Sequence, residues 1–517
     1  MTQILVPGLT CFSETYGPEK SGVLVDGKNF YKAVYEACCK AERTILMTGW
    51  QFASKVELVR GDDADCCDHP TKLVDFLRSL CEEKPELDIY MLAWDASAVF
   101  AFEREPLQRL KFQLLGHKRI HWKMDNSHPR GASHHQKLIA IDRSIAFVGG
   151  MDVCNSRYDD RCHEADTKVR CEGSKTHAPY HDVQAYVTGD PVDRLRTWFC
   201  ERWEAATGKP LELPDVPRKE IAIKPSFDVE APTIGLTRTL PRMTDPPTAS
   251  VHEIYELHLR AIAAAERVIY FENQYLSCDE IADALERRMR ASCDPPLEII
   301  FVLPEKSAGF KERISIGVYQ QELLERLGKV AAETGHHLGV YYSCACGKKG
   351  DVPVFIHAKV LTVDDRFLLV SSANTSNRSM GFDTELGIAW ESPTATDSLR
   401  NARVDLMREH CGLEDSEVDA VLADPDNLVE RLDDMARAKS HKLRIHKRNV
   451  DEKPGRFLAW LLPEKTPFDP DDPQSFNEAL PEPGALLDRL FREPFMMARQ
   501  SFHKIRPRFR KQLKAGR

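Results

Sequence analysis

Long hydrophobic runs are missing from this sequence of 517 residues. Its longest apolar stretches, such as 299–303 and 457–462, fall far short of the roughly 18 residues that a membrane-spanning helix needs. The first residues also lack the basic and apolar segments of a secretory signal peptide. We therefore expect a soluble chain that is cytoplasmic or peripheral at a membrane, with signal-independent secretion as the alternative.

A disulfide framework is also excluded. The 15 cysteines are odd in number and include two adjacent pairs, Cys38–Cys39 and Cys66–Cys67, a pattern typical of reduced thiols. Hydrophobic residues (42%) and charged residues (29%) occur at ordinary levels, which excludes collagen-like and disordered classes. At about 100–200 residues per domain, the length predicts two to four domains.

The chain as a whole lacks an excess of basic over acidic residues. The net charge is −9, which disfavours nucleic acid as a partner, but residues 499–517 hold eight Lys or Arg and no acidic residue. Phe502, Ile505 and Phe509 alternate with these cations. This basic tail (499–517) could bind anionic lipid headgroups, or it could be a solubilising terminus. We expect a phospholipid membrane surface as the partner, no protein partner, and a monomer.

Three short sequences recur in the same order, which indicates an internal duplication. Residues 41–45 (AERTI) match 265–269 (AERVI), 87–92 (LDIYML) match 297–302 (LEIIFV), and 135–142 (HQKLIAID) match 357–364 (HAKVLTVD). Helical patterns alternate with short β-branched runs in each copy, so we predict two α/β sandwich domains. Their predicted bounds are 1–204 and 250–415.

The segment between the copies, 205–249, contains eight prolines and is predicted to be an irregular connection. Residues 416–517 lie beyond the second copy and are predicted to form a C-terminal extension with the basic tail. Within this extension, 416–442 has a helical pattern.

The pattern HxKx4D occurs once in each copy, as His135, Lys137 and Asp142 and as His357, Lys359 and Asp364. One match would be weak evidence, but two at equivalent positions are strong evidence of a site. Residues i and i+2 of a strand share a face, so each His and Lys should point into one space. Each Asp follows its His by seven residues, an odd offset, so we assign the aspartates a structural or supporting role.

If the two copies face each other, two imidazoles and two ammonium groups converge, a combination that suits a phosphodiester. The lysines would neutralise the phosphoryl oxygens, so the chemistry needs no metal ion or cofactor. One imidazole would attack phosphorus, while the other would protonate the leaving oxygen and then activate water or an alcohol.

The paired HxKx4D motifs resemble those of the phospholipase D superfamily, over about residues 25–415. Further stretches are similar to its eukaryotic-type branch in a short form; they are 149–159 (GGMDVCNSRYD), 179–182 (PYHD), 269–275 (IYFENQY), 371–374 (SSAN) and 377–385 (NRSMGFDTE). The resemblance implies a bilobal fold of two pseudo-symmetric α/β/α sandwich domains with the active site at their interface.

The resemblance also favours His135 as the nucleophile and His357 as the general acid and base. Polar residues near the motifs are expected to orient the imidazoles. We expect Glu385 to pair with His357, and Asp159 or Asp160 to pair with His135; Asp152 and Asn374 are further supporting residues. His181 is interpreted as a structural hydrogen-bonding residue.

The expected activity is hydrolysis of the distal phosphodiester of a glycerophospholipid, which yields phosphatidic acid and a head-group alcohol. Three alternatives remain open. They are phosphatidyl transfer to an alcohol, as in cardiolipin synthesis, a nuclease or other phosphodiesterase, and an inactive membrane-binding scaffold. The charge of −17 outside the basic tail disfavours the nuclease, and two intact His–Lys pairs disfavour the scaffold.

Overall fold

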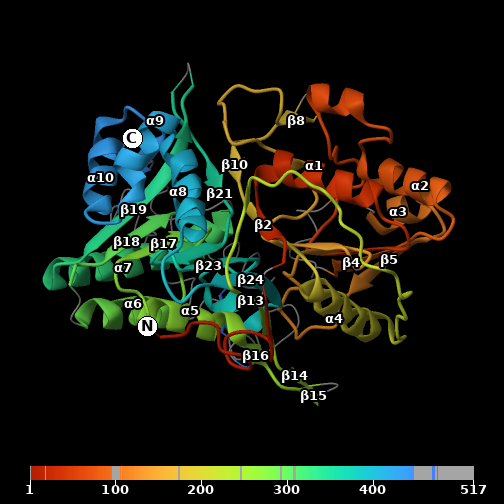
Figure 1. The fold of residues 1–517 in the computed structure, drawn as a ribbon, viewed down its shortest axis with the longest axis horizontal. Helices are drawn as coiled ribbons and strands as arrows, with labels where there is room; N and C mark the ends of the chain where they lie inside the picture. Colours follow the sequence, from red (N-terminus) through yellow and green to blue (C-terminus); the bar gives the residue numbers. More distant parts are fainter. Residues whose placement is uncertain are drawn as a thin grey trace, which may run out of the picture.

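A computed structural model describes most of the chain; the described residues are 2–17, 19–95, 105, 108–172, 175–244, 247–291, 294–306, 310–347, 350–446, 469–471 and 474. Our predictions for the apolar segment 457–462 and for the basic tail concern residues outside this described part. Two lobes make up the fold, one built around each copy of the repeat (Figure 1).

The first lobe contains an eight-stranded sheet. Its strands β3, β4 and β5 are parallel, and the others pair antiparallel. In spatial order the strands are β12 (Phe227–Asp228), β2 (Ser21–Val25), β11 (Val183–Thr188), β7 (Ile145–Gly149), β6 (Leu138–Ile141), β3 (Thr44–Gly49), β4 (Asp88–Trp94) and β5 (Ile120–Asp125).

The second lobe repeats this order in an eleven-stranded sheet. The path runs through β1 (Thr15–Tyr16), β13 (Thr233–Leu240), β24 (Glu385–Glu391), β23 (Phe367–Ser371), β22 (Val360–Val363), β17 (Val268–Glu272), β18 (Glu298–Val302), β19 (His337–Ala345) and β20 (Val352–Pro353). Strands β16 (Val251–His252) and β25 (Leu443–Ile445) pair with β13 and β19. The order β2-β11-β7-β6-β3-β4-β5 matches β13-β24-β23-β22-β17-β18-β19, which confirms the duplication.

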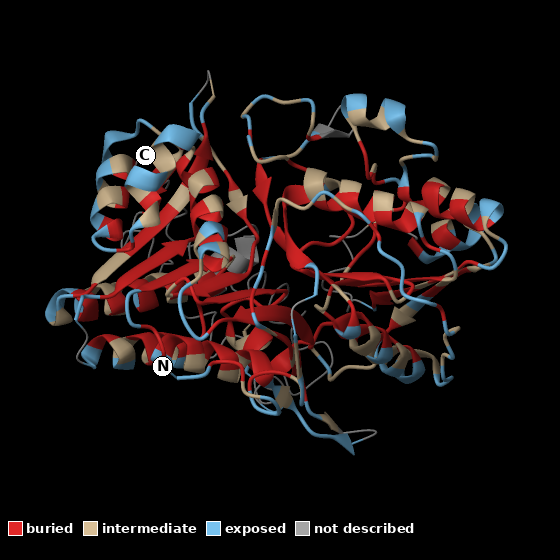
Figure 2. Cartoon of the chain, viewed as in Figure 1, coloured by how far each residue is buried: buried red, intermediate tan, exposed pale blue. Residues whose placement is uncertain are grey.

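Helices cover both faces of each sheet. They are α1 (Asp26–Cys39), α2 (Leu73–Glu83), α3 (Gln108–Leu115) and α4 (Asp190–Thr207) in the first lobe, and α5 (Glu253–Ala263), α6 (Asp279–Arg290), α7 (Phe310–Thr334) and α8 (Asp397–Cys411) in the second. Side chains of a strand alternate between faces, so Ile45 and Met47 pack under α1 and α2, whereas Leu46 joins a core with α4 and α8. The predicted α/β/α sandwich class is confirmed, and Figure 2 shows the buried strands between half-exposed helices.

The remaining described elements are short. They are β8 (Cys171–Glu172), β9 (Lys175–Thr176), β10 (Tyr180–His181), β14 (Met243–Thr244), β15 (Pro247–Thr248), β21 (Phe355–Ile356), the 3₁₀ turns η1 (Gly61–Cys66) and η3 (Asn155–Arg157), and the π-helical turns η4 (Arg378–Phe382) and η5 (Asp419–Ala423). Strands β10 and β21 come from different lobes and pair in parallel. This pairing joins the lobes beside the second motif.

The structure differs from the predicted irregular connection at 233–240. These residues form β13, which pairs with both β1 and β24 of the second sheet. The prolines end at Pro232 and resume at Pro241, so every backbone N–H between them can join the ladder. Ile234 and Leu236 are buried on this strand. The N-terminal β1 also belongs to the second sheet, although the sequence suggested that residues 1–204 form the first unit.

Beyond the second copy, the expected helical region is present as α9 (Asp415–Val418), η5 and α10 (Leu428–Ala438). Helix α10 packs against β19 and β25 at the edge of the second sheet. Among the described residues, no helix combines the length and the apolar composition that a membrane crossing requires.

Candidate active site

The two motifs lie where the lobes meet. The backbone of each motif histidine forms a hydrogen bond with the backbone of the other lobe. The N–H of His135 donates to the carbonyl of Thr384 at 3.0 Å, and the N–H of His357 donates to the carbonyl of His181 at 2.8 Å. Both histidines therefore lie three residues before a central strand, β6 or β22, rather than within it as the sequence suggested, and their backbones are held by the opposite lobe.

The imidazoles are oriented by carboxylates, also across the interface. Nδ1 of His135 lies 3.0 Å from Oε2 of Glu385, and Nδ1 of His357 lies 2.6 Å from Oδ2 of Asp182. Asp182 directly precedes β11, and Glu385 begins β24, the equivalent strand of the second lobe. Each lobe thus supplies one histidine and the carboxylate that orients the other lobe's histidine.

This exchange corrects the pairing expected from the sequence, which assigned Glu385 to His357 and Asp159 or Asp160 to His135. The expectation was wrong because it paired groups without knowing how the two lobes face each other. Asp159 is buried and accepts bonds from His163 Nδ1, Arg170 and the N–H of Tyr180. Asp160 accepts the N–H of Cys162 in a turn.

The two motif lysines have equivalent positions. Nζ of Lys137 donates to the carbonyl of His135, and Nζ of Lys359 donates to the carbonyl of His357. Oδ2 of Asp152 lies 3.6 Å from the Lys137 Nζ, while Asp152 Oδ1 accepts the N–H of Trp50 at 2.7 Å. Both lysines are buried, so a bound anion would meet ammonium groups that are little screened by water.

Asn374 occupies the position in the second lobe that Asp152 has in the first, since each is the fourth residue of the matching sequences 149–152 and 371–374. Its side chain is nearly buried, and its Oδ1 has no hydrogen-bond partner among the described residues. The amide oxygen of Asn374 is thus available to accept a hydrogen bond.

Burial and charge shift the titration of the second motif. Burial lowers the pKa of His357 well below its usual value, and the charges of Lys359, Arg157, His135 and Lys137 lower it further. The first-motif groups are thus close enough to act on the second-motif imidazole. Burial also raises the pKa of Asp182 to about 7 and lowers that of Lys359 to about 7. Lys359 and Asp182 together therefore add little net charge near neutral pH.

The motif aspartates do not reach this site. Asp142 accepts the backbone N–H groups of Glu42, Arg43 and Thr44, and Asp364 accepts those of 266–268 in the same way. Both adopt positive φ, 49° and 52°, which Asp tolerates better than most residues. The recurring sequences at 41–45 and 265–269 are thus the loops that these aspartates cap.

Sequence reasoning missed Asp182, which was part of the quoted stretch 179–182 but received no role. The available signal was its place at the start of a strand, the same place that Glu385 has in the second copy. It also missed Ser372, whose hydroxyl donates to Glu385 and accepts the N–H of Leu386. This serine holds the carboxylate that orients His135.

Comparisons with known proteins agree with this geometry. The family model "Cardiolipin synthase, PLD-like domain" matches residues 258–403. Phospholipase D alpha 4 of Arabidopsis thaliana is 23% identical, with 80% of this chain and 67% of that protein covered. Phospholipase D2 of Bos taurus is also 23% identical, but this chain spans only 53% of it.

Among solved structures, the phosphatidylserine synthase of Haemophilus influenzae Rd KW20 has a similar fold, with a TM-score of 0.51 and 13% sequence identity. The alignment covers 82% of this chain and 95% of that one. The duplicated sheets, the two motifs at the interface and these similarities together show that the chain belongs to the phospholipase D superfamily.

Proposed function

We propose that this protein is a phospholipase D, which cleaves the distal phosphodiester of glycerophospholipids to phosphatidic acid and a head-group alcohol. The observation that carries the proposal is the reciprocal orientation of the two motif histidines by Glu385 and Asp182. Because each Nδ1 faces a carboxylate, each Nε2 is left for the reaction.

In the proposed first step, Nε2 of His135 attacks phosphorus and forms a P–N bond. The bond from phosphorus to the head-group oxygen breaks, and Nε2 of His357 gives that oxygen a proton. The negative charge of the bound phosphodiester favours the protonated imidazole, which burial and the nearby cations disfavour in the free site. In the second step, Nε2 of His357 takes a proton from water, whose oxygen attacks phosphorus and releases His135 with phosphatidic acid. The assignment of the two histidines follows the family resemblance.

The buried lysines support this proposal. A phosphodiester brings one negative charge into a site where burial disfavours the charged form of Lys359. The anion therefore favours protonated Lys359, and both ammonium groups can then stabilise the charge that builds on the phosphoryl oxygens. Glu385 and Asp182 similarly stabilise whichever imidazole becomes protonated during the cycle.

Phosphatidyl transfer to an alcohol is the second candidate. It is favoured by the matched domain's description as a cardiolipin synthase domain and by the similar fold of a phosphatidylserine synthase. The same residues would serve, since only the nucleophile of the second step changes from water to an alcohol. Hydrolysis and transfer therefore differ in what enters the site after the head group leaves.

Product analysis separates these functions. The purified protein is incubated with mixed phospholipid vesicles, with and without a primary alcohol, and with plasmid DNA in parallel. We expect phosphatidic acid without the alcohol and some phosphatidyl alcohol with it, whereas DNA stays intact. Formation of phosphatidyl alcohol alone would favour a transferase. Nicked DNA with unchanged lipids would refute both lipid activities, and no product from any substrate would support the inactive scaffold.

A further inference from the structure

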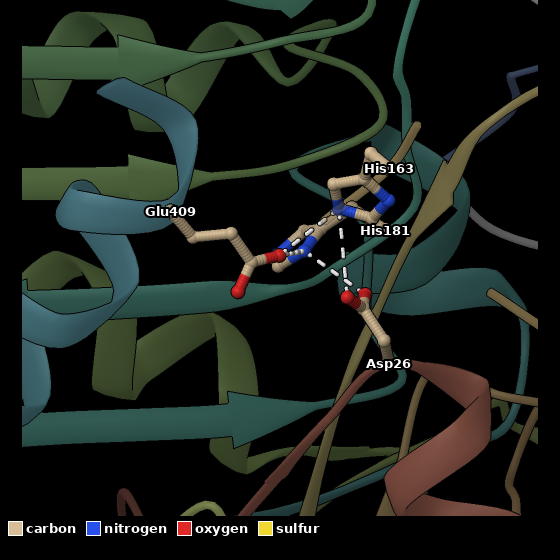
Figure 3. A group of neighbouring side chains, drawn as sticks. All are labelled: Asp26, His163, His181 and Glu409. Carbon is tan, nitrogen blue, oxygen red and sulfur yellow. Dashed lines mark hydrogen bonds and ion pairs between the residues drawn. The ribbon is translucent and has the colours of Figure 1, made fainter. Parts of the chain in front are cut away.

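A second group of titratable side chains lies next to the active site but takes no part in the proposed chemistry. Figure 3 shows its four members, Asp26, His163, His181 and Glu409, which point toward one another. Asp26 begins α1, His181 ends β10, and Glu409 comes from α8 of the second lobe. Their side chains are almost completely buried, with exposed fractions of 0–1%.

The spacing of these groups suits a small cation. Oε1 of Glu409 lies 2.8 Å from Nδ1 of His181 and 3.0 Å from Nε2 of His163. The Asp26 oxygens lie 3.1 Å from Nδ1 of His181 and 3.5 Å from Nε2 of His163. Tetrahedral zinc with bonds of about 2.0–2.1 Å separates its ligand atoms by about 3.3 Å. The four separations above, 2.8–3.5 Å, lie near this value, and all four ligand atoms lie within 4.8 Å of one another.

The far nitrogens of both imidazoles are also arranged as in metal sites. Nδ1 of His163 lies 2.9 Å from Oδ2 of Asp159, and Nε2 of His181 lies 2.9 Å from Oε2 of Glu272. A histidine that binds a metal usually donates its other N–H to a carboxylate or carbonyl. Both histidines therefore have the outer partner that would leave the inner nitrogen free for a metal.

One carboxylate oxygen of the cluster accepts no hydrogen bond from the described residues, and its contact with Nε2 of His163 is 3.5 Å long. Oδ2 of Asp26 is buried and accepts no hydrogen bond within the described part of the chain, which is costly for a carboxylate. The charge balance also leaves room for a divalent ion. The surrounding carboxylates outnumber the arginines that pair with them, so an excess of negative charge remains; the carboxylates are those of Asp26, Asp159, Glu272, Asp405 and Glu409, and the arginines are Arg161 and Arg170.

We propose that Asp26, His163, His181 and Glu409 bind one zinc ion. Two protonated imidazoles would balance the same charge, so binding exchanges one Zn²⁺ for up to two protons, from Nε2 of His163 and Nδ1 of His181. Four protein ligands fill the coordination sphere, which is typical of a structural site. The ion would tie Glu409 of the second lobe to three residues of the first.

The zinc site would also support the active site without touching the substrate. His181 precedes Asp182 in the chain, and its carbonyl accepts the N–H of His357 at 2.8 Å. The N–H of Asp26 donates to the carbonyl of Asp182 at 2.8 Å. A metal that fixes His181 and Asp26 thus fixes the backbone on both sides of the carboxylate that orients His357. This proposal does not rest on the proposed function.

Metal analysis tests the site. The chain of 517 residues, without a histidine tag, is produced with zinc in the medium and purified without chelators. We expect about one zinc per chain by mass spectrometry of the elements. After removal of zinc, Co²⁺ should bind with the strong visible absorption of a tetrahedral complex, and added Zn²⁺ should displace it and release protons.

Near-isosteric variants identify the ligands. Asp26→Asn and Glu409→Gln should each lower zinc affinity at least tenfold, whereas His441→Asn, a partly buried histidine outside the cluster, should bind zinc like the unchanged protein. Circular dichroism verifies that each variant folds. Should both variants fail to fold, the cobalt spectrum and proton release of the unchanged chain still decide. Zinc-free protein that takes up neither metal would overturn the proposal, as would zinc binding unaffected in folded variants.

Discussion

Oδ2 of Asp182 lies 2.6 Å from Nδ1 of His357, although the two residues belong to different lobes. Glu385 and His135 form the reciprocal pair. A site made this way exists only when the two lobes are docked, because neither lobe holds both an imidazole and its carboxylate. Both histidine–carboxylate pairs therefore form only when the two lobes dock.

Removing either carboxylate should reduce turnover. We expect Asp182→Asn and Glu385→Gln to lower kcat by about 10²–10⁴-fold with little change in KM, because an amide no longer holds the imidazole in its tautomer or stabilises its charge. Asp160→Asn should change kcat less than threefold, since Asp160 holds only a local turn. Steady-state kinetics on a soluble short-chain phospholipid measures all three. A large effect of Asp160→Asn alone would restore the pairing expected from the sequence.

The two histidines should differ in the intermediate that their variants accumulate. With a radiolabelled lipid, His357→Ala should trap phosphatidyl-His135 or lose both half-reactions, whereas His135→Ala should form no covalent adduct. Turnover should be abolished in both. Because a P–N bond to imidazole hydrolyses in acid, the reaction is quenched in denaturant at mildly alkaline pH, and the protein is digested and analysed by mass spectrometry to locate the adduct. An adduct on His357 in the His135→Ala variant would reverse the assigned roles.

Phosphate affinity should fall as the pH rises. The pKa of Lys359 is lowered to about 7, so its ammonium form dominates below pH 7 and its neutral form above. Asp182 gains its negative charge over the same range, because its pKa is raised to about 7. A dialkyl phosphate stays a monoanion throughout, so its inhibition constant should rise about tenfold from pH 6 to pH 8. An inhibition constant independent of pH would contradict these shifts.

The motif aspartates should affect stability rather than chemistry. Asp142→Ala leaves three backbone N–H groups without their acceptor, so we expect a loss of about 1–3 kcal/mol in the free energy of unfolding. Asp142→Asn keeps one acceptor and should lose less. Urea unfolding gives the free energies, and kcat of the folded Asn variant should stay within threefold. A thousandfold loss of kcat in a fully folded Asp142→Asn variant would place this residue in the reaction.

The basic tail should contribute to membrane binding. Its eight cations and three apolar side chains predict that deletion of 499–517 weakens binding to vesicles containing phosphatidylglycerol at least tenfold at low salt. Neutral vesicles serve as the comparison, and binding is measured by co-sedimentation. Turnover of a soluble short-chain substrate should not change. Equal binding of the full and shortened chains to anionic vesicles would leave the tail as a solubilising terminus.

The sequence by itself determined the duplication, the sandwich class and the positions of the two motifs. These are local properties, because strand and helix patterns repeat along the chain and each His–Lys pair directly precedes a buried apolar strand. The sequence also showed the segments 41–45 and 265–269 as repeats. It did not show that Asp142 and Asp364 accept hydrogen bonds from their backbone N–H groups.

Only the tertiary structure decided which partners meet. Glu385 pairs with His135, and Asp182 pairs with His357, because the lobes dock face to face. The spacing of residues within one segment does not encode pairing between segments of different lobes. The same docking brought Glu409 of α8 to Asp26, His163 and His181, which are far apart in the sequence. The hydrophobic periodicity of a sequence indicates which face of its own helix or strand a residue occupies. Contacts between lobes depend instead on how the surfaces of the two folded lobes fit together.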